Sequence, residues 1–260
     1  MMCAVLAGAP GDWPEPRHDA CLTAVQPLAG TMAEAPVVVA RYTLPSQPQS
    51  LTASLAPAQD GTARGLTLVS GALCCYAAPD RLVWRSHPGG INYDAVVTVA
   101  DINADGNAEI LLKAGRPAMP YGAAVLLDSE SGALLWRYDL EPMSYSWTLH
   151  AADYLPENPG LEVVALMMGY PPDSANGYVA LFHWRDGGMV QRWRYDFDRY
   201  TCFPSLLTPD LDGDGKREIA IETHSRMWVF NADSGEKRHF FQWDTSPANV
   251  RSYGLIRFVD

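Results

Sequence analysis

The segment 208–223, TPDLDGDGKREIAIET, places carboxylates at a spacing that could do metal chemistry. Asp210, Asp212 and Asp214 stand at alternate positions, and Glu218 follows four residues after Asp214. Four carboxylates this close repel one another, and their pKa values rise, unless a cation lies among them. The segment therefore predicts a cation site.

The spacing also indicates which cation. Numbered from Asp210, the acidic residues hold positions 1, 3, 5 and 9, and Gly215 provides a sharp turn at position 6. Lys216 at position 7 can offer only its backbone carbonyl, because its side chain is cationic. Oxygen atoms at alternate positions suit a hard ion that takes about six to eight oxygen ligands. Calcium fits best, since magnesium favours fewer protein ligands and zinc favours His or Cys.

A looser copy, VADINADGNAEILLKA, occupies 99–114 and has Gly106 at position 6. Its amide at position 3 replaces a carboxylate but keeps an oxygen, so we expect calcium to bind here more weakly than at the later copy. The ligands predicted in this copy are Asp101, Asn103, Asp105, Asn107 and Glu109. For both copies, the alternative is a solvated acidic turn without metal.

A third copy, ADYLPENPGLEVV at 152–164, keeps Asp153, Glu157 and Glu162 but has Leu155 at position 3. We expect a rigid, Pro-rich turn that has lost the ion. An EF-hand is a poor match to any copy. Position 12 is Ile221 in one strong copy and Leu112 in the other, where an EF-hand needs an acidic ligand, and the flanking sequences are strand-like rather than helical.

The elements that position these loops form a repeat. Trp84, Trp136, Trp193 and Trp243 are each followed 17 residues later by an aspartate: Asp101, Asp153, Asp210 and Asp260. Each period contains four short β-rich segments bounded by turn residues, and no segment has the periodicity of a long helix. Four strands in about 50 residues is the size of one β-propeller blade.

The predicted fold is therefore all-β: a β-propeller of four-stranded blades, about four blades plus a partial one, truncated at the C-terminus. We expect an N-terminal lead-in at 1–34 and the propeller over 35–260. The blades fall at roughly 50–86, 93–139, 146–196 and 203–244, with a partial blade from 252.

Composition limits the function. The net charge of -11 over 260 residues argues against a nucleic-acid surface and suits cation binding. No apolar run approaches the roughly 20 residues that a membrane helix needs. The N-terminus lacks a convincing signal peptide. The five cysteines show no CxxC pair, and we expect the neighbours Cys74 and Cys75 to be buried as small hydrophobic residues.

Three family resemblances follow from these motifs. DLDGDGKREIAI and DINADGNAEILL resemble the loops of FG-GAP/VCBS-type repeats, found in integrin α-subunit-like and many bacterial secreted propellers. This resemblance implies calcium in each intact loop, between the first two strands of a blade. LLDSESGALLW resembles the tryptophan-docking motif of quinoprotein-like repeats, which implies that Trp136, and by register Trp84, Trp193 and Trp243, pack one blade against the next. NPGLEVV at 158–164 is similar to a phrase in family 11 rhamnogalacturonan lyases.

Catalytic motifs are weak. No histidine lies in a metal-spaced pair, and neither a nucleophile elbow nor a phosphate-binding loop occurs. His150 is expected to be a packing residue, and His224 an exposed turn residue. The turns 168–178 and 116–122 are the best recognition candidates, with an ordinary long connection as the alternative.

These observations favour a secreted or surface-exposed, calcium-stabilised β-propeller that acts as a non-catalytic binding, adhesion or scaffolding module. Its expected partners are calcium and a polysaccharide or protein ligand, with no nucleic acid and no membrane span. The alternative is a polysaccharide-active enzyme resembling rhamnogalacturonan lyases. A quinoprotein-like oxidoreductase is a third hypothesis.

Overall fold

The structure is a computed structural model. It describes residues 55–57, 63–77, 81–87, 89, 91–116, 119–140, 147–168, 177–197, 205–208, 210–223 and 226–242. All of them belong to one compact unit, Ala40–Tyr253. The expected lead-in at 1–34 and the expected partial blade from 252 lie outside the described residues.

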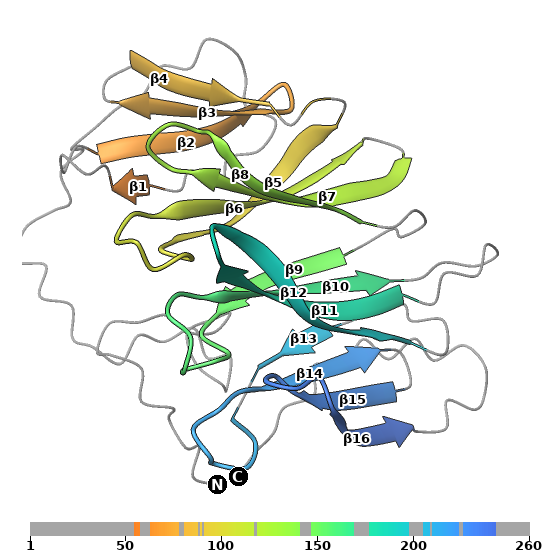
Figure 1. The fold of residues 1–260 in the computed structure, drawn as a ribbon. Coiled ribbons are helices and arrows are strands. Elements are labelled where there is room, and N and C mark those ends of the chain that lie inside the picture. Colours follow the sequence, from red (N-terminus) through yellow and green to blue (C-terminus); the bar gives the residue numbers. More distant parts are fainter. Residues whose placement is uncertain are drawn as a thin grey trace, which may run out of the picture. The chain divides into compact units, whose positions relative to one another are not determined.

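The described residues form four antiparallel sheets, each made of four strands that are consecutive in the sequence (Figure 1). They contain no helix, and hence no helix able to cross a membrane. The all-β fold of consecutive four-stranded propeller blades is thereby confirmed.

The strands follow in chain order, four to a blade. The first blade has β1 (Leu55–Pro57), β2 (Ala63–Val69), β3 (Ala72–Ala77) and β4 (Arg81–Ser86), and the second has β5 (Asn92–Ala100), β6 (Glu109–Arg116), β7 (Met119–Asp128) and β8 (Leu134–Asp139). The third has β9 (Trp147–Ala152), β10 (Glu162–Met168), β11 (Gly177–Arg185) and β12 (Gly188–Asp196), and the fourth has β13 (Ser205–Leu207), β14 (Glu218–Thr223), β15 (Arg226–Asn231) and β16 (Lys237–Gln242).

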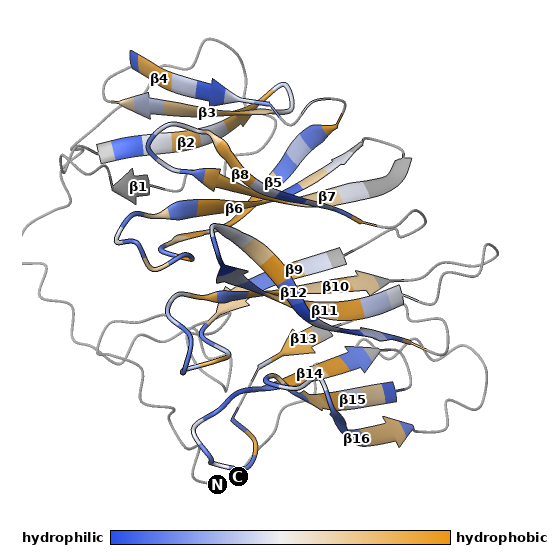
Figure 2. Ribbon diagram, viewed as in Figure 1, coloured by the Kyte–Doolittle hydropathy of each residue, from blue (hydrophilic) through white to orange (hydrophobic). Residues whose placement is uncertain are grey.

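The middle strands are buried on both faces, which explains their unbroken apolar runs. Alternate residues of a strand point to opposite faces. In β10, Val163 and Ala165 join a cluster with the second blade, whereas Val164 and Leu166 join a cluster with the fourth. Figure 2 shows hydrophobic residues along these middle strands and hydrophilic residues in the loops that enter them. Successive blades therefore share apolar interfaces.

Each blade has a β-bulge at the same place, where its third and fourth strands pair. The register shift skips one residue of the fourth strand in every sheet. A bulge inserts an extra residue and re-aims side chains locally. From the first blade to the fourth, the bulge residues are Val83, Leu135, Arg192 and Arg238.

The residue after the bulge corrects one sequence interpretation. It is Trp84, Trp136 and Trp193 in the first three blades, but His239 in the fourth, where it pairs with Val229. The sequence repeat instead aligns Trp243 with these tryptophans, four residues later and outside the described residues. That alignment is wrong at the fourth blade. The 17-residue spacing from Trp to Asp carries no information about where the β-bulge falls, and the bulge decides which residue takes the tryptophan position.

Two tryptophans dock on the next blade. The Trp84 indole donates a hydrogen bond to the Ser129 carbonyl at 3.1 Å, and a Cβ on Gly132 would lie 2.6 Å from its ring. Trp193 repeats the arrangement with the turn of the fourth blade. Both glycines also have positive φ, so each turn needs glycine for two reasons. The packing role expected for these tryptophans is confirmed.

Trp136 contacts the next blade differently. Its neighbour is Phe182 of β11, with ring centroids 5.2 Å apart. The turn that could have received it is the two-residue turn at Asp186 and Gly187, and a Cβ on Gly187 would meet nothing within 4 Å. The tryptophan thus keeps its packing role with an aromatic partner in place of a turn.

Candidate metal-binding loops

Three acidic loops enter the second strand of a blade. We name them by blade: the second-blade loop, 101–109, leads into β6; the third-blade loop, 153–162, leads into β10; and the fourth-blade loop, 210–218, leads into β14. Each begins with an aspartate and ends with a glutamate that opens the next strand. The loops therefore join the first two strands of their blades.

The closing glutamate is buried in every loop and holds the loop's own backbone. Glu109 is 1% exposed, and its Oε2 accepts hydrogen bonds from the backbone amides of Ile102 and Asn103 at 2.7 and 3.1 Å. Glu162 accepts from the two equivalent amides of its loop. Glu218 accepts from the Leu211 amide at 2.6 Å. The carboxylate thus ties the second loop position to the first residue of the following strand.

This anchoring refines the ligand set expected from the sequence. The third-blade loop lacks the alternating aspartates but keeps the same glutamate contact, so the contact does not depend on those aspartates. One carboxylate oxygen of Glu109 and of Glu218 is committed to the backbone, which leaves Oε1 for an ion. Burial raises the pKa of both carboxyls, and that of Glu162, above the usual glutamate range.

The first aspartate closes the turn in the same way in the two intact copies. Asp101 accepts from the backbone amides at positions 5 and 6 of its loop, at 3.1 and 3.0 Å. Asp210 accepts from those at positions 4 and 6, at 2.8 and 2.9 Å. Each side chain therefore lies at the centre of its loop.

The aspartates at position 5 also match. Asp105 accepts from the Asn107 amide at 2.8 Å, and Asp214 accepts from the Lys216 amide at the same distance. This backbone hydrogen bond lowers the pKa of Asp105. The two loops thus form the same backbone cage around differing side chains.

Three carboxylates of the fourth-blade loop converge. One ligand oxygen from each of Asp210, Asp212 and Glu218 lies within 4.8 Å of the other two. Asp210 and Asp212 are exposed, whereas Glu218 is buried. An all-oxygen donor set with one buried and two solvent-facing carboxylates fits a hard divalent cation that keeps some water ligands.

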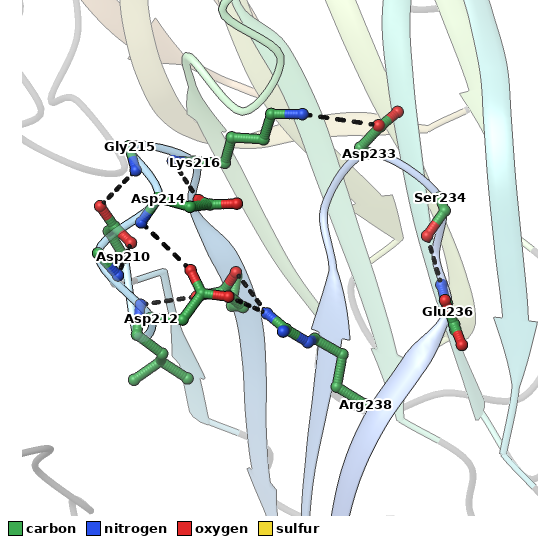
Figure 3. A network of polar contacts seen from close by, with 12 residues as sticks. Asp210, Asp212, Asp214, Gly215, Lys216, Asp233, Ser234, Glu236 and Arg238 are labelled. Atoms are coloured by element: carbon green, nitrogen blue, oxygen red, sulfur yellow. Dashed lines mark hydrogen bonds and ion pairs between the residues drawn. The ribbon is translucent and has the colours of Figure 1, made fainter.

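A protein cation already contacts two of these groups. The Arg238 guanidinium lies 2.6 Å from Asp212 Oδ2 and 3.4 Å from Glu218 Oε1, and Figure 3 shows its side chain directed into the loop. Its hydrogen bond lowers the pKa of Asp212. Lys216 turns away, with Nζ 4.0 Å from Asp233 Oδ2. The sequence pattern of the loop could not predict this contact, because Arg238 lies twenty residues beyond Glu218 on a different strand.

The third-blade loop has an apolar, packed residue at position 3 in place of an oxygen ligand. Leu155 at position 3 and the neighbouring Tyr154 are both fully buried in the cluster shared with the fourth blade. Arg192, the bulge residue of this blade, lies 3.9 Å from Glu157 and bonds Asp233 of the next blade. This arrangement supports the expectation of a structural turn.

The NPG sequence at 158–160 has a packing role. A Cβ on Gly160 would lie 2.2 Å from the Ile102 carbonyl oxygen, and the Leu161 amide donates to that same oxygen at 3.1 Å. The third-blade loop is thereby pressed against the second-blade loop. The NPGLEVV segment, which resembles a phrase in rhamnogalacturonan lyases, therefore contributes to the contact between these two blades.

Other candidates give no catalytic geometry among the described residues. His150 Nδ1 lies 2.7 Å from the hydroxyl of the fully buried Tyr154, and burial lowers the pKa of His150, as suits a packing residue. Cys74 and Cys75 are buried free thiols, as expected. His224 and residues 169–176 of the recognition turn 168–178 lie outside the described residues. In the other candidate, 116–122, only residues 117 and 118 lie outside them. Arg116 pairs with Met119 there, so most of this segment belongs to strands β6 and β7.

No protein-family model matches the sequence, and no curated protein matches it. Solved structures with similar folds include the exotype rhamnogalacturonan lyase YesX, at 19% identity and a TM-score of 0.48 over 70% of this chain and 39% of that one. The V. cholerae biofilm matrix protein Bap1 gives 20% identity and a TM-score of 0.46 over 73% and 28%. The Dos1 propeller gives 12% identity and 0.41 over 75% and 51%. Identities this low say nothing of a shared ligand or activity.

Proposed function

We propose that this chain is a calcium-stabilised β-propeller module that binds or scaffolds a partner at the cell surface or outside the cell, without catalysis. The observation that carries the proposal is the cage found in both intact loops. In both loops the backbone amide at position 6 donates to the aspartate at position 1, and the amide at position 7 donates to the aspartate at position 5. In the fourth-blade loop, side-chain oxygens also converge.

Calcium would be held by the side chains at positions 1, 3, 5 and 9 and by the backbone carbonyl at position 7. In the fourth-blade loop these are Asp210, Asp212, Asp214, Glu218 and Lys216; in the second-blade loop they are Asp101, Asn103, Asp105, Glu109 and Asn107. The ion would supply positive charge where carboxylates repel. Because each loop joins two strands, binding to the folded state alone stabilises the blade.

The binding role is supported by a rigid scaffold whose recognition candidates are turns between strands. Its partner would be a polysaccharide or a protein. The lyase-like alternative rested on the NPGLEVV phrase, and the close approach of Gly160 to Ile102 gives that phrase a packing explanation. A packing role is compatible with either hypothesis, and the measurement of polymer size described below separates them.

Calcium removal tests the metal assignment. The melting temperature of the purified chain should fall in chelator, because an ion at about 100 times its Kd stabilises the folded state by about 2.7 kcal/mol. The variant Asp212→Ala/Asp214→Ala should lose the fourth-blade share of this dependence. Asp186→Asn/Asp196→Asn removes two exposed carboxylate charges elsewhere and is the control; asparagine is chosen because Asp186 has a positive φ. Identical melting curves with and without chelator would contradict the assignment.

A second measurement separates binding from catalysis. The calcium-loaded chain is mixed with pectin-type polysaccharide, and both co-sedimentation and the size of the polymer are followed. For a polysaccharide partner, the chain should co-sediment with the polymer and leave its size unchanged. If the chain does not co-sediment and the polymer size is unchanged, a protein partner is favoured. Depolymerisation would overturn the non-catalytic proposal in favour of the lyase-like alternative.

A further inference from the structure

We propose that Arg238 is a resident counter-ion of the fourth-blade loop, competing with calcium for Asp212 and Glu218 and keeping the loop folded when calcium is absent. The inference rests on the proposed calcium binding and concerns its regulation. It makes the fourth-blade loop a site with two alternative cations, one of them built into the chain.

The geometry places the guanidinium where a metal would have to bind. Of the three groups whose oxygens converge, Arg238 already contacts Asp212 and Glu218, at 2.6 and 3.4 Å. Glu218 is 3% exposed, so its charge has little water to screen it. A carboxylate with so little water around it is stabilised by a positive partner, and the chain provides one.

The β-bulge explains how Arg238 reaches the loop. The skipped residue of β16 is re-aimed relative to its neighbours, and in this blade that residue is the arginine. In the second blade the same position is Leu135, which has no charge to offer. Position 3 of the loop differs in parallel, being Asp212 where the bulge residue is Arg238 and Asn103 where it is leucine.

In these paired differences the arginine offsets the extra carboxylate among the predicted ligands. The second-blade loop carries three carboxylates and the fourth-blade loop carries four, and the extra one is Asp212, the closest partner of Arg238. Lys216 and Arg217 of the fourth-blade loop contact Asp233 and the Thr208 carbonyl instead of these carboxylates. An incoming calcium ion therefore meets three carboxylates not offset by the arginine at each site. The higher calcium affinity expected at the fourth-blade loop from its carboxylate count is reduced by the arginine.

The first test measures calcium binding calorimetrically on the full chain with the second-blade loop silenced by Asp101→Asn/Asp105→Asn. Adding Arg238→Leu, the residue found at the same bulge position one blade earlier, should tighten calcium binding about three- to ten-fold. In chelator the same substitution should lower the melting temperature. Arg185→Leu removes an equal charge from an exposed site and should change neither quantity.

The reverse substitution tests the inference should Arg238→Leu fold poorly. In a chain whose fourth-blade loop is silenced by Asp212→Ala/Asp214→Ala, Leu135→Arg with Asn103→Asp rebuilds the pair in the second-blade loop. Compared with Asn103→Asp alone, the added arginine should weaken calcium binding there by about the same three- to ten-fold factor. It should also reduce the loss of melting temperature in chelator.

The outcomes separate the two proposals. Calcium binding that is unchanged by Arg238→Leu and by Leu135→Arg would overturn the counter-ion role and leave calcium stabilisation intact. Absence of calcium binding in the parent chain and in every variant would overturn calcium stabilisation, and with it the competition. Tighter binding without arginine and weaker binding with it would support both.

Discussion

The second-blade and fourth-blade loops share a backbone cage but are held in place by different forces. At position 2, Ile102 is fully buried between two blades, whereas Leu211 is only half-buried. The fourth-blade loop has instead an arginine among its carboxylates. One turn geometry is therefore stabilised mainly by packing in one blade and partly by charge in the other.

The neighbouring blade makes the difference. The second-blade loop receives the Gly160 turn of the third blade, which approaches the Ile102 carbonyl closely and donates the Leu161 amide to it. A loop braced in this way keeps its shape whatever its charge. In the fourth-blade loop the described residues add the Arg238 ion pairs to the shared cage, so this loop should be the more sensitive of the two to ionic conditions.

The largest expected effect tests the packing half of this comparison. Ile102→Ala should lower the free energy of unfolding by about 3 kcal/mol, because it opens a cavity in a fully buried cluster. Leu211→Ala should cost less than about 1 kcal/mol, since its side chain is already partly in water. Urea unfolding of both variants in chelator gives the two values without a contribution from calcium.

Ile102→Val serves as the control for this pair. It removes one methylene and should cost only about 1 kcal/mol. Equal losses for Ile102→Ala and Leu211→Ala would break the comparison, because the two loops would then depend on packing to the same extent.

The closing glutamates give the next largest effect. Glu109→Ala leaves one buried and one partly buried amide without an acceptor and should destabilise the chain by about 2 kcal/mol in chelator. Glu218→Ala leaves one partly buried amide, which water can reach, and should cost about 1 kcal/mol. Thermal unfolding monitored by circular dichroism measures both.

Hydrogen exchange locates the change. The freed amides of Ile102 and Asn103 should exchange faster in Glu109→Ala, while the β14 amides keep their protection. A larger loss for Glu218→Ala than for Glu109→Ala would show that the fourth-blade loop depends more on its glutamate than its hydrogen bonds indicate.

Much of the fold could be predicted from local patterns. Short β-rich segments between turn residues recur once per blade, and tryptophans such as Trp84 and Trp193 mark the contact between blades. Those signals are local in sequence, and the structure confirms them. The register of the fourth blade could not be predicted, because the bulge that places His239 at the tryptophan position has no residue signature of its own.

The candidate site was predictable as a set of oxygen atoms and unpredictable in its partners. Alternating aspartates identify the cage, since the spacing fixes which side chains share a turn. The contact of Arg238 with Asp212 and that of Gly160 with Ile102 both join residues from different strands or blades. A single sequence does not indicate which of its distant positions are in contact. The interactions that distinguish the two loops could therefore be identified only from the structure.

The smallest expected effect concerns position 4, where the loops differ only in conformational strain. Ala104 has a φ of 62° and Gly213 a φ of 73°, both in the left-handed region. An alanine there costs about 1–2 kcal/mol, partly offset by the roughly 0.5–1 kcal/mol that glycine loses in chain entropy on folding. Ala104→Gly should therefore stabilise the chain by up to about 1 kcal/mol, and Gly213→Ala should destabilise it by a similar amount.

A Cβ on Gly213 would meet nothing within 4 Å, so its replacement reports on backbone conformation rather than on packing. Matched urea titrations of the two variants and the parent chain, with and without calcium, measure the pair. Opposite shifts of equal size would mean that the two cages have the same backbone energy, so that packing and charge alone distinguish the loops. A neutral Gly213→Ala would mean that the fourth-blade loop relaxes to accept a side chain, as expected of a turn whose described contacts include a movable arginine.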